Sequence, residues 1–175
     1  MYKVERVTFT KVSPNYQKAV LSSIGAQLSN LTFLSCESID MTDLVACTAL
    51  EVLRILFYST LCLPENPVDK FSVHAFLPKL YYLESDICLH ERFSHLFAEK
   101  CSITHLELEC CHIGTKASTL NWNNMAKYWQ RIQILRIRQC TGLDVASVKS
   151  LCRQLPKLKE LSLPSSNEFR IQYLN

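Results

Sequence analysis

The sequence predicts an α/β fold in which short parallel strands alternate with helices or loops as a repeating unit. First, one aliphatic pattern recurs seven times along the chain. Second, stretches of helical periodicity lie between several of the recurrences. Third, the 175 residues include only three glycines and six prolines, fewer turn residues than a β-sandwich normally needs. The apolar content of 48% is typical of a globular chain with a substantial core.

The recurring pattern has aliphatic residues at its first and fourth positions, and usually at its sixth. Its copies begin at Val4, Leu31, Leu50, Leu80, Ile103, Ile132 and Leu158, with spacings of 27, 19, 30, 23, 29 and 26 residues. Such a unit cannot bury its apolar edge alone and needs stacked neighbours. We therefore expect a single domain over residues 1–175, with about seven irregular units. Ser85 replaces the third aliphatic residue of the fourth copy, so we expect a local weakness in the sheet there.

Helices are expected between the strands. Ser13-Pro14 should open the first, because a hydroxyl residue caps a helix and proline suits its first turn. Asp144 should open another, and a shorter helix is expected over residues 40–47. The expected inward residues of the two longer helices are Val20, Leu21, Ile24 and Leu28, and Val145, Val148, Leu151, Cys152 and Leu155.

Three further segments are less regular. Residues 92–100 carry helical periodicity, and residues 62–70, with Pro64 and Pro67, should form a loop. Trp122, Met125 and Trp129 share one helical face. We interpret this stripe as core packing, with a docking site on the convex side as the alternative.

The nine cysteines are interpreted as reduced thiols. Their number is odd, no secretory segment precedes them, and no pair has CxxC spacing. We expect Cys36, Cys47, Cys101 and Cys152 to be buried, since free cysteine behaves as a small hydrophobic residue. The sequence has no apolar run long enough to cross a membrane and no apolar core of a signal peptide near Met1. The expected location is therefore the cytoplasm or the nucleus.

The repeated pattern resembles that of leucine-rich repeat proteins, whose units span roughly 20 to 29 residues. Cysteine occupies the ninth position of three copies, at Cys88, Cys111 and Cys140, where that family places Asn or Cys. Residues 132–140, followed by 142–144 and 151–158, resemble the cysteine-containing repeats of F-box leucine-rich proteins. The resemblance covers residues 4–164 as architecture and about a third of the chain in its cysteine signature. It implies a right-handed α/β horseshoe solenoid with a concave parallel sheet and convex helices or loops.

The same resemblance implies a function. In F-box leucine-rich proteins the repeats select a protein substrate, while a separate F-box motif docks onto a ubiquitin ligase. No F-box-like Leu-Pro segment precedes the repeats here, and neither end resembles a polar capping repeat. We therefore expect this chain to be a fragment of a longer protein. Ribonuclease-inhibitor-type proteins and nucleotide-binding innate receptors share the architecture without the ligase connection.

A concave surface can be predicted from strand alternation, which directs positions three, five and seven of the pattern away from the core. Position three is mostly apolar and aromatic, as interface anchors often are. The candidate partner-binding residues are Phe33, Arg54, Tyr82, Glu84, Asp86, His105, Glu107, Glu109, Arg136 and Arg138.

Four carboxylates form a block on this predicted surface, at Glu84, Asp86, Glu107 and Glu109, with arginines on either side. In one interpretation, Glu107 pairs with Arg136, and Glu109 with Arg138, across neighbouring strands. In the other, Glu84 and Asp86 are not neutralised and attract a basic segment of a partner, with Tyr82 and His105 packing beside it.

Catalysis is not expected. Carboxylates on an open strand face have no cleft to shift their pKa values, and neighbours in Cys110-Cys111-His112 point to opposite faces. Cys101, Cys110, His105 and His112 lack a recognised metal-ligand spacing, so we assign no catalytic, cofactor or metal residue. The net charge of +3 is not clustered as nucleic-acid binding requires.

We therefore expect a module that binds a protein partner on its concave face, as the substrate-recognition part of an F-box-type ubiquitin ligase receptor. A structural segment of a larger scaffold, or of a nucleotide-binding innate receptor, is the alternative. An enzyme is a distant third.

Overall fold

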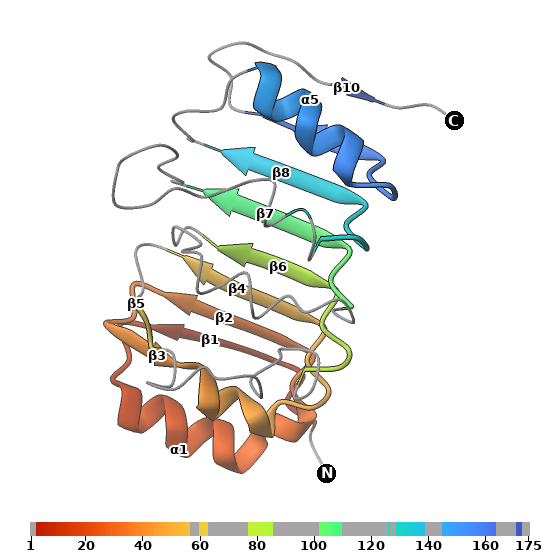
Figure 1. Ribbon diagram of the computed structural model, residues 1–175. Coiled ribbons are helices and arrows are strands. Elements are labelled where there is room, and N and C mark those ends of the chain that lie inside the picture. The colour runs from red at the N-terminus through yellow and green to blue at the C-terminus, as the bar shows by residue number, and fades with distance from the viewer. Residues whose placement is uncertain are drawn as a thin grey trace.

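The computed structural model describes residues 3–56, 60–62, 77–85, 102–109, 126, 129–138, 145–163 and 171–172. The fold is mixed α/β, as expected, and is built on one sheet with seven parallel strands and an antiparallel eighth (Figure 1). The parallel strands are β1 (Arg6–Thr10), β2 (Asn30–Leu34), β4 (Val52–Leu56), β6 (Tyr82–Ser85), β7 (His105–Glu109), β8 (Ile134–Arg138) and β9 (Glu160–Ser162). They lie side by side in chain order, so each new strand is added next to the one before it.

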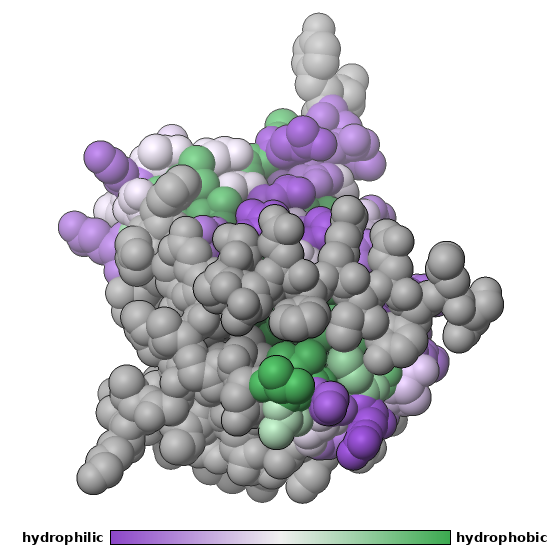
Figure 2. Space-filling view, turned by 90° about the horizontal axis from the view of Figure 1, so that it is seen from above, coloured by the Kyte–Doolittle hydropathy of each residue, from purple (hydrophilic) through white to green (hydrophobic). Residues whose placement is uncertain are grey.

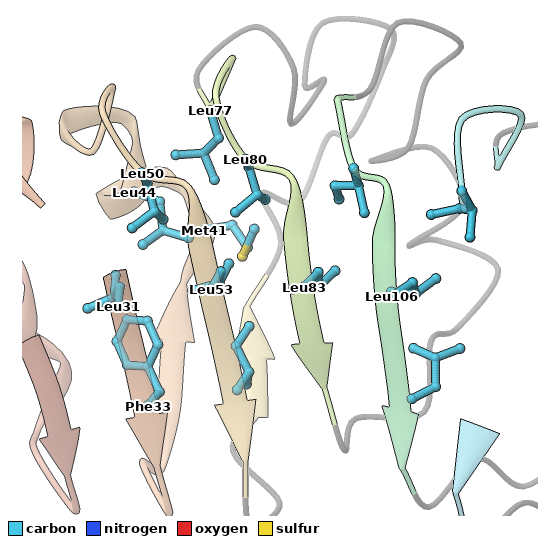
Figure 3. Close-up of a cluster of buried hydrophobic side chains, with 14 of the residues drawn as sticks. Leu31, Phe33, Met41, Leu44, Leu50, Leu53, Leu77, Leu80, Leu83 and Leu106 are labelled. Carbon is cyan, nitrogen blue, oxygen red and sulfur yellow. The ribbon is translucent and has the colours of Figure 1, made fainter. Parts of the chain in front are cut away.

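The strands are aligned at their first residues. Arg6, Asn30, Val52, Tyr82, His105, Ile134 and Glu160 are register partners in successive strands. The next residue of each strand points into the core, which gives a row of aliphatic side chains across the sheet. Leu31, Leu53, Leu83 and Leu106 in Figure 3 belong to this row. Since every strand contributes at the same level, one continuous core runs through the units.

The second unit differs from the prediction. The expected strand pattern was Leu31-Leu34-Cys36, but the register aligns Leu28, Leu31 and Phe33 with the core positions of the other units. Phe33 is completely buried, and its ring stacks on Phe9 at 5.4 Å between centroids. The predicted place of Phe33 on the exposed face of the sheet is therefore wrong.

Helix α1 (Pro14–Ile24) begins at Ser13-Pro14, as predicted, with Pro14 in its first turn. The Ser13 side chain makes no capping hydrogen bond, so that part of the prediction is wrong. Leu21 is fully buried in the core. Gln17 is also buried, and its Nε2 donates to the carbonyl oxygens of Val12 at 2.7 Å and Ser38 at 3.2 Å. These bonds tie α1 to the start of β3 (Ser38–Asp40), which pairs in parallel with β5 (Thr60–Cys62) in a small second sheet. The sequence analysis did not predict this sheet.

Two 3-10 helices follow α1 in the N-terminal half, η1 (Gly25–Gln27) and η2 (Met41–Ala46). The second lies within the predicted short helix over residues 40–47. Its first turn is capped by Asp40, whose carboxylate accepts from the backbone N–H of Thr42 at 2.8 Å. Met41 and Leu44 lie on the side of η2 that packs into the core.

Helix α5 (Val145–Gln154) lies at the predicted position in the C-terminal half. Leu151 and Leu155 join the core, but Val145 is 63% exposed, so its predicted inward placement is wrong. Trp129 is buried, in agreement with core packing. Trp122, Met125 and the predicted helix over 92–100 lie outside the described residues. So does the predicted loop over 62–70, except for Cys62, which ends β5 instead.

The C-terminal edge of the sheet is covered. Strand β10 (Ile171–Gln172) runs antiparallel to β9, and Ile171 is the register partner of Leu161. Viewed from this end, the described surface mixes polar and apolar areas (Figure 2).

The sheet continues through the predicted weak point in the fourth unit. Ser85 is buried and is the register partner of both Ile55 and Leu108. Cys36 and Cys47 are buried, as expected, whereas Cys152 is only partly buried. Cys101, Cys88, Cys111 and Cys140 lie outside the described residues. No helix in the described part of the chain is both long and apolar enough to span a membrane.

Candidate protein-binding surface

The side of the sheet opposite the core, which we call the open face, carries the first, third and fifth residues of the strands. Two neighbouring rows run across its middle. One contains Val52, Tyr82, His105 and Ile134, and the other contains Arg54, Glu84, Glu107 and Arg136. The open face brings together eight of the ten predicted site residues: Arg54, Tyr82, Glu84, His105, Glu107, Glu109, Arg136 and Arg138. Phe33 lies in the core instead, and Asp86 is outside the described residues.

Aromatic rings gather around His105. Its ring meets Tyr81 edge-on at 5.9 Å and Tyr82 at a tilt at 6.5 Å, between centroids. Thr104 Oγ1 lies 2.8 Å from His105 Nδ1 and fixes the orientation of the imidazole. The guanidinium of Arg54 lies over the Tyr82 ring, 4.9 Å from its centroid, at cation–π distance. These side chains contact one another in a partly apolar patch of the kind that supplies interface anchors.

Glu84 is not the unpaired carboxylate that one interpretation of the sequence required. Its Oε2 accepts from Arg54 Nε at 3.0 Å and from the Tyr82 hydroxyl at 3.1 Å. Arg54 and Glu84 are register partners on adjacent strands, so their side chains meet directly. The prediction of a free acidic pair at Glu84 and Asp86 is therefore wrong for Glu84.

Tyr82 is held in its neutral form by the same surroundings. Burial raises the pKa of its hydroxyl well above the usual value near 10, and the carboxylates of Glu84 and Glu107 raise it further. A neutral phenol donates its proton to a carboxylate, as the bond to Glu84 requires.

Glu107 is the buried charge of the open face, with only 5% of its surface exposed. Its Oε1 accepts from Arg136 at 2.7 Å, and its Oε2 accepts from Arg138 at 2.9 Å. The predicted pair of Glu107 with Arg136 is therefore present. Arg138 also contacts Glu107, a pair that the sequence analysis did not predict.

Arg136 links two carboxylates. Besides Glu107, it donates through Nε to Glu160 Oε1 at 3.0 Å. The hydrogen bond to Glu160 is the main cause that raises the pKa of Arg136, and Glu107 contributes in the same direction. The sequence analysis placed Glu160 in position three of its unit but did not predict this contact. Tyr81 was also missed, because it precedes its strand and lies outside the strand alternation.

The charges of the open face balance within the described strands. Four arginines and four glutamates occupy it: Arg6, Arg54, Arg136, Arg138, Glu84, Glu107, Glu109 and Glu160. A surface of this kind offers directed hydrogen bonds but little net field to attract a charged partner.

Most of the residues considered from the sequence for catalysis or metal binding lie outside the described residues, namely Cys101, Cys110, Cys111 and His112. Among those that the structure describes, no three His, Cys, Asp or Glu side chains are grouped as a metal site would require. Comparison with models of known protein families and with curated proteins finds no match to this chain.

Proposed function

We propose that the chain is a leucine-rich repeat module that binds another protein on the open face of its sheet. The observation that carries the proposal is the patch of Tyr81, Tyr82 and His105, held in place by Arg54 and Glu84. Rigid aromatic side chains lose little entropy on binding, and they contribute disproportionately to protein interfaces.

The repeat assignment is supported by how the units are joined. Parallel strands lie in chain order, are aligned at their first residues, and share one core across successive units. An array built in this way presents one extended face that a partner can cover.

The finer proposal is that this module selects a substrate for a ubiquitin ligase. Its support is the resemblance of residues 132–158 to F-box leucine-rich repeats, and β8 and α5 occupy this region. That activity requires an F-box in the same polypeptide. Co-purification of a ligase adaptor with the full gene product would support this finer proposal, and its absence would favour a structural segment of a larger scaffold.

The binding proposal is tested by substitution at matched tyrosines. Partners are captured with the unsubstituted chain, and the affinity of a captured protein is then measured with Tyr82→Ala and Tyr16→Ala. Tyr82 lies in the patch, whereas Tyr16 is 62% exposed on α1. We expect Tyr82→Ala to weaken binding at least tenfold, as for an anchor residue worth about 2 kcal/mol. Equal affinities for the two variants would contradict binding at the patch.

A further inference from the structure

The edge of the sheet at which the parallel strands begin, which we call the rim, carries an ordered row of residues just before the strands (Figure 1). Thr104 N donates to Tyr81 O at 2.9 Å, and Gln133 N donates to Thr104 O at 2.8 Å. Lys159 N continues the row by donating to Gln133 O at 2.8 Å. This backbone ladder connects the aromatic patch, at Tyr81, with the start of β9.

Basic side chains gather on the rim before β8 and β9. Arg131 and Lys157 are the third residues of equivalent four-residue turns, each closed by a backbone hydrogen bond from its fourth residue to its first. Lys79 holds the same place in the turn before β6. Since neighbouring parallel strands lie about 4.8 Å apart, the turns of Arg131 and Lys157 are adjacent. Together with Lys159, these two residues form what we call the basic rim.

The basic rim is not neutralised by the described residues around it. Over residues 129–138 and 145–163, Glu160 is the only acidic residue, and its carboxylate accepts from Arg136 on the open face. All three side chains of the basic rim are exposed, and none forms an ion pair with a described residue. Arg131 is exposed although β7 and β9 flank its strand, so the stacking of units does not cover this surface.

Two more cations lie on α5. Lys149 and Arg153 are exposed and four residues apart, so they share one face of the helix. Gln130 Nε2 donates to the carbonyl oxygen of Gln154 at 3.1 Å, which holds the end of α5 against the turn that carries Arg131. This part of the rim therefore presents a concentrated positive charge, in contrast to the balanced open face.

An acidic residue lies on the other side of the aromatic patch. Glu51 precedes Tyr81 in the ladder, since Tyr81 N donates to Glu51 O at 3.0 Å. Glu51 is exposed and forms no ion pair with a described residue. The charge of the ladder thus changes from negative at Glu51 to positive at Lys159, and these two ends attract opposite charges of a partner.

We propose that the protein partner bound at the aromatic patch carries an acidic segment, which lies on the basic rim. This inference rests on the proposed function. Three strand spacings, about 14 Å, separate Tyr81 from Lys159, and an extended segment of about four or five residues spans that distance. The opposite orientation would bring the acidic segment to Glu51, so the charges select one direction for the partner.

Affinity measurements on two variants of equal charge test the inference. A partner captured with the unsubstituted chain is measured against the basic-rim variant, Arg131→Gln/Lys157→Gln/Lys159→Gln. The control, Lys3→Gln/Arg6→Gln/Lys18→Gln, removes the same charge from exposed positions of the first unit. We expect the basic-rim variant to weaken binding roughly tenfold at low salt and to reduce its salt dependence, and the control to change neither. Equal losses in the two variants, or no change in the basic-rim variant, would overturn the inference.

The outcome is distinguishable from failure of the proposed function. If Tyr82→Ala weakens binding and the basic-rim variant does not, the patch binds the partner and only the acidic segment is wrong. If only the basic-rim variant weakens binding, the proposed function fails, together with the inference that rests on it. A DNA duplex that binds the unsubstituted chain but not the basic-rim variant, while partner affinity is the same for both, would assign the basic rim to nucleic acid and overturn the acidic segment.

Discussion

At the scale of single residues, the open face is organised around Glu107. A carboxylate this deeply buried is stable only when it is paired and hydrogen-bonded. Arg136 and Arg138 meet that need from the neighbouring strand, and Arg136 carries the connection on to Glu160. This network links charged side chains of β7, β8 and β9 next to the aromatic patch.

Glu107→Gln should lower the free energy of unfolding by about 1–2 kcal/mol, since two charge-assisted hydrogen bonds weaken while the arginines can still reach water. Glu160→Gln, at a more exposed carboxylate, should cost less than about 1 kcal/mol. Urea unfolding of the two variants measures the difference. Equal losses would contradict the central role of Glu107.

The raised pKa of Tyr82 predicts that the stability of the fold depends on pH in the alkaline range. The folded-state pKa is raised by burial and by Glu84 and Glu107, so the folded chain keeps the phenolic proton to a higher pH than the unfolded chain does. This contribution is fully present below the unfolded pKa near 10 and is lost as pH rises above it.

Tyr82→Phe should therefore make stability decline less steeply above pH about 10 than in the unsubstituted chain. Thermal unfolding of the variant and of the unsubstituted chain over an alkaline pH series measures the two slopes. An unaltered slope in Tyr82→Phe would contradict the assignment.

At the scale of elements, the pattern predicted six of the seven parallel strands in their observed frame. It failed in the second unit for a local reason. Leu28, Leu31 and Leu34 are each three residues apart, so two frames satisfy the first and fourth positions equally. The two frames differ in the residue at the sixth position. In the structure this residue is Phe33, whose ring stacks on Phe9 of the neighbouring strand. A contact between strands cannot be seen within one unit.

The two frames make opposite predictions for adjacent residues. Phe33→Ala should cost about 3–5 kcal/mol, because it empties a buried site. Leu34→Ala should cost much less, because Leu34 is only partly buried on the other side of β2. Denaturant unfolding measures both. A larger loss for Leu34→Ala would restore the frame expected from the sequence.

The starts of α1 and α5 were predictable because their signals are local: a proline in the first turn of α1 and helical periodicity in both. The β3–β5 sheet and β10 were not. Each is only two or three residues long and carries no periodic pattern. Likewise, the rows of the open face and the Glu107–Arg136 pair followed from alternation, whereas the bonds from Arg138 to Glu107 and from Arg136 to Glu160 depended on side-chain reach.

At the scale of the whole molecule, destabilising one unit should also destabilise its neighbours, because successive strands share one row of core side chains. Leu106→Ala, in the middle of this row on β7, should cost about 2–5 kcal/mol. Hydrogen exchange should show protection falling more in β6 and β8 than in β1 and β2. A uniform fall across all strands would indicate a single cooperative unit instead.

The most direct test of binding at the open face is site-specific photo-crosslinking. A photoreactive residue is placed at His105 in one variant and at Tyr16 on α1 in another, and each is irradiated with a captured partner. We predict a crosslinked complex from position 105 that is lost on adding Tyr82→Ala, and none from position 16. Crosslinking from position 16 alone would contradict the account.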